Sequence, residues 1–396
     1  MDRSKWEYKK LGEVCVSIDD GDWIESQDQS PEGIRLIQTG NIGIGEYIDK
    51  SDKAKYISED TFERLKCKEI FGGDCLISRL PDPIGRACIL PDMSDRMITA
   101  VDCSIVRFKD IIVPDFFVHY TKSSNYNSDI NKHATGATRK RISRKNLEGV
   151  IIPTPPVADQ QRIVAELDCL NEMIALKQGQ LKEFDKLAQS IFYDMFGDPV
   201  TNEKGWDRIK LGDICTCITK GTTPTTLGFP FVEEGVNFVK VESFVDGKID
   251  PAKLTHITNE CNLALSRSQL ENEDLLVCIA GATIGKMAFV DTSILPANTN
   301  QACAIIRLKE KKNLRFIHSF LTLKLKNDII QMGKGVAQPN LSLGQLRDFV
   351  ISFPPLALQQ QFAEKIQAIE SQKELVKQSI AETQHLLDSR MDYYFD

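Results

Sequence analysis

Residues 151–163 read Ile151-Ile-Pro-Thr-Pro-Pro-Val-Ala-Asp-Gln-Gln-Arg-Ile163, and residues 351–362 read Ile351-Ser-Phe-Pro-Pro-Leu-Ala-Leu-Gln-Gln-Gln-Phe362. Both stretches place a Pro-Pro pair directly before a long run that has apolar residues every three or four positions. Proline has no amide proton and keeps the residue before it out of the helical region, so each pair predicts the start of a helix. The first helix is expected to stop near Phe196, because Gly197-Asp-Pro199 combines a C-terminal glycine with a breaker.

The apolar positions after both Pro-Pro pairs alternate in steps of four and three, which is typical of a coiled-coil seam. Each helix should span about 38 residues, or about 57 Å. The predicted packing positions of the helix pair are Ile163, Leu167, Leu170, Ile174, Leu181, Phe362, Ile366, Ile369, Val376 and Ile380. A whole lobe separates the helices and returns the chain, so we expect antiparallel packing, with Leu170 and Ile174 against Val376 and Ile380. Apolar stripes of this kind most often have only a packing role in the protein core. A packing role is sufficient here, because two helices that space the lobes need a shared core.

The chain repeats itself with a period of about 200 residues, which suits a doubled domain and is far too long for a solenoid. The residues Trp6, Gly12, Asp74, Gly85, Arg107, His119 and Gln160 recur as Trp206, Gly212, Asp274, Gly285, Arg307, His318 and Gln359. Between these anchors the copies differ, most clearly over residues 22–54 against 222–254. Such divergence is expected when a shared scaffold carries variable loops.

Each copy begins with short apolar runs bounded by Gly, Asp and Pro, which predict the strands of an α+β lobe. Strands are expected at 33–37, 75–77, 103–108 and 150–152, and helices near 58–68 and 114–131. The predicted architecture is two tandem similar α+β lobes separated by two long helices that pack as an antiparallel coiled coil. The predicted domains are lobe 1–152, helix 153–196, linker 197–205, lobe 206–352 and helix 353–396.

Composition places the chain among ordinary globular proteins, with 42% apolar and 27% charged residues in 396. No apolar run reaches about 18 residues and no apolar segment follows the first charges, so we expect neither membrane spanning nor secretion. The eleven cysteines contain no Cys-x-x-Cys pair, which argues against a zinc ribbon and favours reduced thiols in a cytoplasmic protein. The net charge of −7 arises in 153–205 and 353–396, so basic patches on the nearly neutral lobes are not masked.

A basic segment stands out between residues 130 and 147, which hold six Lys or Arg and no Asp or Glu. These six are Lys132, Arg139, Lys140, Arg141, Arg144 and Lys145. A solvated charged face is the ordinary explanation of such a run. However, Gly136 precedes the cluster and favours a flexible approach on which Arg reaches phosphates or the O6/N7 edge of guanine.

The counterpart of this segment in the second copy, residues 333–340, replaces most of the charge with amides. Its candidate DNA contacts are Lys334, Gln338 and Asn340, and the two amides suit bidentate contacts to adenine. Packing within a loop is the alternative role of Gln338 and Asn340. Two lobes that read different DNA sequences need different side chains at equivalent positions, as is found here.

A second aligned pair of loops contains Gly85 and Gly285, which are expected to share a tight turn. The stretch around Gly285 superficially resembles a phosphate-binding loop, but its glycines are one residue too close and Met287 replaces the required Ser or Thr, so we exclude nucleotide binding. The remaining candidate DNA contacts are Arg79, Arg86 and Lys286. The five histidines lack metal-ligand spacing, and no methyltransferase or nuclease motif is present, so no catalytic or metal-binding residues are predicted.

In this order, the features resemble the specificity subunit of a type I restriction-modification system. The resemblance covers essentially the whole chain and is carried by the two Pro-Pro stretches, by Met195-Phe-Gly-Asp-Pro199, and by Trp6-x3-Lys10-Leu-Gly-Glu-Val14 with its copy Trp206-x3-Lys210-Leu-Gly-Asp-Ile214. One departure is Leu358, where the first copy has Asp159, so the second helix lacks a favourable carboxylate in its first turn.

The resemblance implies that each lobe is a target recognition domain that reads one half of a bipartite site in double-stranded DNA. It further implies that the helices set the spacing and bind modification (methyltransferase) subunits, which a restriction (endonuclease and translocase) subunit joins. Catalysis would lie in those partners, so the chain is expected not to be an enzyme and to bind no cofactor, while S-adenosylmethionine, ATP and magnesium bind the partner subunits. The alternatives are a two-lobed protein-binding scaffold without DNA specificity and an enzyme with an unrecognised motif.

Overall fold

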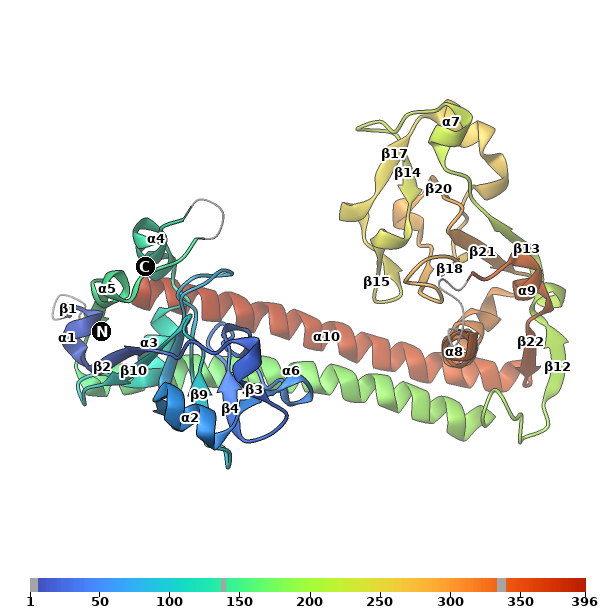
Figure 1. Cartoon of the computed structure of the whole chain (residues 1–396). Helices are drawn as coiled ribbons and strands as arrows, with labels where there is room; N and C mark the ends of the chain where they lie inside the picture. Colours follow the sequence, from blue (N-terminus) through green and yellow to red (C-terminus); the bar gives the residue numbers. More distant parts are fainter. Residues whose placement is uncertain (1–5, 137–139, 333–339) are drawn as a thin grey trace. The chain divides into compact units, whose positions relative to one another are not determined.

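The computed structural model describes residues 6–136, 140–332 and 340–396 (Figure 1). The chain forms two compact units, Met1–Gln178 with Lys377–Asp396, and Gly179–Val376. Helix α6 (Val157–Phe196) and helix α10 (Leu356–Phe395) each have 40 residues, and each contributes one half to either unit. The first unit therefore combines one lobe with half of each long helix, and so does the second.

Lobe 1 contains the strands β1 to β11 of the first unit. A two-stranded ribbon joins the two ends of the lobe through β1 (Glu7–Lys10) and β11 (Ile151–Thr154). An antiparallel sheet has the strand order β2 (Cys15–Asp20), β10 (Cys103–Phe108), β7 (Cys75–Ser78) and β8 (Ala87–Ile89). A mixed sheet has the order β3 (Gln29–Ser30), β5 (Lys55–Ile57), β4 (Ile34–Ile37), β9 (Met97–Thr99) and β6 (Glu69–Ile70), with β4 and β9 parallel. The four predicted strands are confirmed.

The helices of lobe 1 are α1 (Leu11–Val14), α2 (Glu59–Leu65), α3 (Pro114–Tyr120), α4 (Ser124–His133) and α5 (Arg144–Glu148). The predicted helix near 58–68 is therefore confirmed, but the expectation of one helix over 114–131 is wrong. The chain breaks between α3 and α4 because the Ser123 hydroxyl accepts a hydrogen bond from the Tyr126 amide at 3.2 Å and starts a new helix. The Thr121 hydroxyl, which donates to the Val118 carbonyl at 2.7 Å, closes the preceding turn.

Lobe 2, in the second unit, repeats this plan with the strands β12 to β22. Its end ribbon pairs β12 (Asp207–Lys210) with β22 (Val350–Phe353). Its four-stranded sheet has the order β13 (Cys215–Lys220), β21 (Cys303–Leu308), β18 (Leu275–Cys278) and β19 (Met287–Phe289). Its mixed sheet contains β17 (Thr255–Ile257), β14 (Val236–Val239) and β20 (Ala297–Thr299), beside the hairpin of β15 (Phe244–Val245) and β16 (Lys248–Ile249). Its helices are α7 (Asn259–Ala264), α8 (Leu314–Met332) and α9 (Leu343–Asp348).

The repeated sequence anchors hold equivalent structural positions in the two lobes. Arg107 donates two hydrogen bonds of 2.7 Å to the Asp74 carboxylate, and Arg307 donates two of 2.8 Å to the Asp274 carboxylate. Such bidentate, charge-assisted pairs lock the end of β7 or β18 to the neighbouring strand. The recurrence of these four residues is therefore structural.

The repeated glutamine secures the start of each long helix. Gln160 is fully buried, donates to the Pro155 and Ile111 carbonyls at 2.8 Å and accepts from the Val113 amide at 2.8 Å. Gln359 is equally buried and donates to the Pro354 carbonyl at 2.8 Å. Gln160, whose donor and acceptor are both satisfied, ties α6 to the lobe that precedes it, whereas the buried side-chain oxygen of Gln359 has no hydrogen-bond partner among the described residues.

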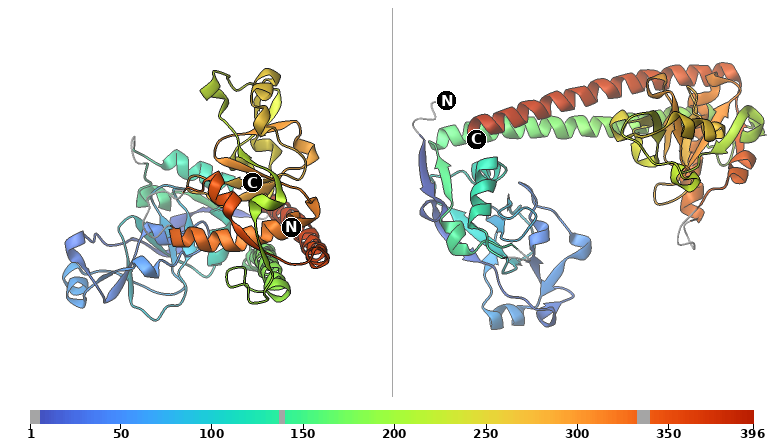
Figure 2. Two further views of the ribbon diagram at one scale, coloured as in Figure 1. Left: turned by 90° about the vertical axis from the view of Figure 1, so that its right-hand side faces the viewer. Right: turned by 90° about the horizontal axis from the view of Figure 1, so that it is seen from above.

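In the first unit, the N-terminal half of α6 packs against the C-terminal half of α10. Figure 2 shows the two helices side by side there, and the shared core contains Ile163, Leu167, Leu170, Ile174, Leu387 and Tyr394, with Ile380 partly buried against it. The ammonium group of Lys177 interrupts this seam and donates to the Thr383 hydroxyl at 2.8 Å. The early part of one helix thus meets the late part of the other, which confirms antiparallel packing.

In the second unit, the C-terminal half of α6 packs against the N-terminal half of α10, but the seam shifts. Its core is formed by Phe192, Phe196, Phe362, Ile366 and Ile369. Ile191 and Met195 continue the spacing of three and four residues from Leu181, but they are only partly buried. The aromatic rings of α8, such as Phe316, stacked at 5.9 Å from Phe192, draw the buried face of α6 toward lobe 2. The other two predicted packing positions, Leu181 and Val376, are half-buried.

Candidate nucleic-acid interface

The basic segment of lobe 1 lies on α4, α5 and the chain between them. Lys132 is exposed in the last turn of α4, and Arg144 and Lys145 are exposed at the start of α5. Lys140 is exposed just before α5. Arg139 lies outside the described residues.

Two arginines of this segment make surface ion pairs. Arg141 lies 3.2 Å from Asp102 with 44% of its side chain exposed, and Arg144 lies 3.4 Å from Glu148. A backbone pairing between Thr135 and Arg141 holds the segment in place. Exposed pairs of this kind contribute little to stability, so both guanidinium groups can exchange a carboxylate for a phosphate.

Arg79 is placed in the interior of lobe 1 rather than on its surface. Only 4% of its side chain is exposed, its guanidinium lies 3.1 Å from Asp20, and it also donates to the Val101 carbonyl. Burial lowers the pKa of Arg79. Its Nε has no hydrogen-bond partner among the described residues but is buried, so this geometry does not support the predicted contact with DNA.

Arg86 is likewise occupied within the lobe. Its guanidinium donates to the Ile42 carbonyl at 2.7 Å, to Thr39 at 2.8 Å, to Leu80 at 2.9 Å and to Pro83 at 3.0 Å. The group therefore fixes the short 3₁₀ helix Thr39–Asn41 against the loop before β8, and these bonds use four of its five N–H donors. Arg86 is a positioning residue in this geometry.

The candidates in lobe 2 are described only in part. Lys286, at the position of Arg86, is exposed. Asn340 is exposed too, and its backbone bridges to Ala280 in the loop that precedes Lys286. Lys334 and Gln338 lie outside the described residues.

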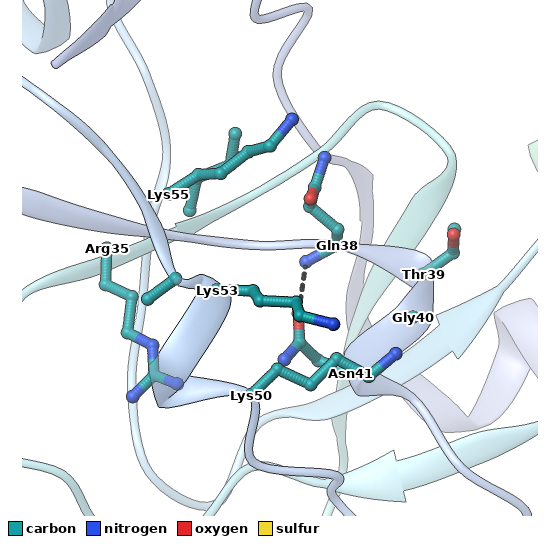
Figure 3. Close-up of a pocket in the computed structure, with 10 residues that line it drawn as sticks. Arg35, Gln38, Thr39, Gly40, Asn41, Lys50, Lys53 and Lys55 are labelled. Carbon is teal, nitrogen blue, oxygen red and sulfur yellow. Dashed lines mark hydrogen bonds between the residues drawn. The ribbon is translucent and has the colours of Figure 1, made fainter. Parts of the chain in front are cut away.

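A polar hollow that the sequence patterns did not reveal lies beside β4 in lobe 1. It encloses about 320 Å³ (Figure 3) and is lined by Arg35, Leu36, Gln38, Thr39, Gly40, Asn41, Lys50, Lys53, Ala54 and Lys55. Figure 3 shows Lys50 and Lys53 extending across the hollow, with the Gln38 side chain turned away from Asn41. The hollow thus combines cationic, amide and hydroxyl groups, the chemistry that contacts phosphates and base edges.

The charge of the hollow comes from its lysines, because Arg35 is neutralised. The buried Arg35 guanidinium lies 2.5 Å from Asp49 and holds the pKa of that carboxyl below its usual range. Lys50, Lys53 and Lys55 are exposed, and in the described part of the chain no carboxylate lies within 4 Å of their ammonium groups. These three lysines are therefore available to an anionic partner.

A second, shallower hollow adjoins the first and shares Gln38 and Lys55 with it. Its wall includes Gln27, Gln29 and Trp23, which is 68% exposed and whose indole nitrogen donates to Glu25 at 3.2 Å. An exposed aromatic ring beside amides and lysines is typical of nucleic-acid surfaces. The divergence of residues 22–54 from 222–254 was the one sequence signal for this surface.

Lobe 1 thus carries a lysine- and amide-rich surface on residues 22–54, the segment in which the two copies of the lobe differ most. A family model described as type I restriction modification DNA specificity domain matches residues 3–185 and again 203–385. The chain belongs to this family.

Named relatives share about a quarter of their aligned residues with the chain. The specificity subunit of the type I restriction enzyme EcoBI from Escherichia coli is 23% identical over 318 residues, covering 72% of this chain and 66% of that subunit. The specificity subunit of the type I restriction enzyme MjaIX from Methanocaldococcus jannaschii is 25% identical over 342 residues, covering 82% and 77%. The chain thus spans slightly less than two thirds of the EcoBI subunit.

Solved structures share the fold at low sequence identity. A chain from a study of complex assembly in the type I R-M system matches with a TM-score of 0.64 and 19% identity, covering 98% of this chain and 97% of that one. The S subunit of a type I restriction-modification system from M. genitalium matches with a TM-score of 0.55 and 14% identity, covering 98% and 95%. Among the residues described above, no helix is both long and apolar enough to cross a membrane.

Proposed function

We propose that the chain is the sequence-specific DNA-binding subunit of a type I restriction-modification complex, and that each lobe reads one half of a bipartite site in double-stranded DNA. One observation carries this proposal. The two lobes share their end ribbon, the order of their four-stranded sheet and their anchors, yet they differ in the side chain that follows β4 and β14, which is Gln38 in lobe 1 and Lys240 in lobe 2. A common scaffold with divergent contact residues is what two different half-sites require.

The long helices supply the distance between the half-sites and a surface for modification subunits. A helix of 40 residues is about 60 Å long, and α6 and α10 both reach from one unit into the other. Both also expose large apolar side chains, including Leu176 at 66% and Leu375 at 59%. Exposed leucines on an otherwise polar helix favour docking of partner subunits.

Catalysis is assigned to those partners. The relatives named above are specificity subunits, which supports a chain that itself neither methylates nor cleaves DNA. S-adenosylmethionine, ATP and magnesium would then bind the modification and restriction subunits, and the complex would act in the cytoplasm.

The test is methylome sequencing of a methylation-free host that expresses the full chain with its modification subunits. We expect methylation at one two-part motif with a fixed gap, and none when the chain is omitted. A motif of a single continuous block would contradict reading by two lobes. If the purified chain binds protein partners but shows no preference in a gel shift with a random duplex pool, the scaffold alternative replaces the proposal.

A further inference from the structure

The first residue after β4 and the first after β14 occupy the same place in the two lobes. Gln38 follows β4 and Lys240 follows β14, and each precedes a 3₁₀ helix of three residues. Their backbone angles agree closely, with φ −117° and ψ 168° at Gln38 and φ −121° and ψ 164° at Lys240. The two side chains therefore leave the sheet in the same direction.

The strands before these residues are held in equivalent registers. Leu36 pairs with Lys55 and Ile98, and Phe238 pairs with Thr255 and Asn298. On the next residue, a threonine hydroxyl of the parallel strand donates to the Ile37 carbonyl at 3.0 Å in lobe 1 and to the Val239 carbonyl at 2.8 Å in lobe 2. Both positions thus start from a rigid and shared base.

In lobe 1, the backbone around Gln38 is fixed by hydrogen bonds, while the side-chain amide of Gln38 remains available. The Gln38 amide N–H donates to the Asn41 side-chain oxygen at 3.0 Å, and Arg86 holds the Thr39 carbonyl at 2.8 Å. Within the described part of the chain, the side-chain amide of Gln38 makes no hydrogen bond, and it borders both hollows. A fixed backbone with a free donor and acceptor suits the reading of a base edge.

In lobe 2, the corresponding side chain is a cation held over an aromatic ring. The Lys240 ammonium lies 4.2 Å from the centre of the Phe231 ring, and the Lys240 carbonyl accepts from the Ser243 hydroxyl at 2.6 Å. The ring orients the lysine without neutralising it, and among described residues no carboxylate lies within 4 Å of its ammonium. Lys240 is therefore available as a donor.

We propose that Gln38 and Lys240 are the equivalent specificity-determining residues of the two lobes, with Gln38 reading an adenine and Lys240 a guanine. The inference rests on the proposed function. An amide offers one donor and one acceptor, which match N6–H and N7 of adenine, whereas an ammonium only donates and matches O6 and N7 of guanine.

The chain offers a matched control at a second equivalent position. Lys53 ends the 3₁₀ helix Ser51–Lys53 and Lys253, which lies 3.6 Å from Asp250, ends the 3₁₀ helix Pro251–Lys253, so both lobes carry a lysine there. Identical chemistry at equivalent places suits a contact with phosphate, which carries no sequence information. Lys53→Ala should therefore weaken binding to every duplex alike.

The experiment expresses the full chain with its modification subunits and determines the methylated motif. Gln38→Lys should change one A·T pair of a single half-site to G·C, and Lys240→Gln should make the opposite change in the other half-site. The gap between half-sites should stay the same in both variants. In competition binding, Gln38→Ala should lose the roughly 5- to 150-fold preference for A·T at that one pair, while Lys53→Ala keeps it.

An unchanged motif for Gln38→Lys beside an intact wild-type motif would overturn this assignment and leave the proposed function standing. A wild-type chain that directs no two-part motif would overturn the proposed function itself. If Gln38→Lys abolishes methylation, competition binding by Gln38→Ala decides. Loss of the A·T preference at one base pair supports the assignment. An unchanged preference at that pair, or an equal loss of affinity for all sequences, rejects it.

Discussion

Removing the Arg86 side chain tests the positioning role that the structure gives it in lobe 1. Its guanidinium donates to four carbonyls, two of them in the 3₁₀ helix and turn at Thr39 and Ile42. A net contribution of about 1 kcal/mol per hydrogen bond amounts to about 4 kcal/mol. Burial lowers the pKa of Arg86, so desolvation offsets part of this gain. We expect Arg86→Ala to lower the free energy of unfolding of the first unit by about 2–3 kcal/mol.

The measurement is urea unfolding combined with amide hydrogen exchange resolved along the chain. Exchange should accelerate most at residues 39–42, because the Thr39 and Ile42 carbonyls lose the donor that holds this turn. Lys286→Ala is the matched control, because this lysine is exposed at the corresponding position of lobe 2 and should change stability by less than about 0.5 kcal/mol. A stable Arg86→Ala variant that instead shows a flatter salt dependence of DNA binding would refute the reasoning and restore the direct phosphate contact.

Three further predictions address charge, distance and pH. Replacing Arg139, Lys140 and Arg141 together by Ala should flatten the slope of log K against log salt by about 0.9 for each phosphate that the variant no longer neutralises, and an unchanged slope in the assembled complex would return the segment to a solvated face. Inserting one heptad near Gln178 and one within 371–374 adds about 10.5 Å, so methylome sequencing should show a gap longer by at most about three base pairs with unchanged half-sites; changed half-site bases would refute the spacer role. Burial lowers the pKa of His318 to about 4, so between that value and about 6.5 only the unfolded chain binds the proton. The second unit should therefore lose at most about 3 kcal/mol as pH falls through this range, and urea unfolding of His318→Gln should show a flatter dependence.

The duplication, four strands of lobe 1 and the course of the long helices could be predicted from the sequence alone. Pro-Pro pairs, Gly197 and apolar spacing are local signals, because backbone restriction and periodicity act within a few residues. Accordingly, α6 ends at Phe196 as expected. The basic segment was found in the same way, since charge can be read directly from composition.

Which side chains are buried, which are already hydrogen-bonded, and which positions of the two lobes are equivalent could be seen only in the folded chain. Arg79 and Arg86 have the residue type of DNA contacts, but several of their partners, such as Asp20, Val101 and Ile42, come from distant segments that local spacing does not bring together. The constant offset of 200 aligns Gln38 with Phe238, whereas the strand pairing aligns it with Lys240, because lobe 2 holds two more residues before β14. Equivalence inside a variable segment depends on hydrogen-bonded register between strands, and register is a property of the folded sheet.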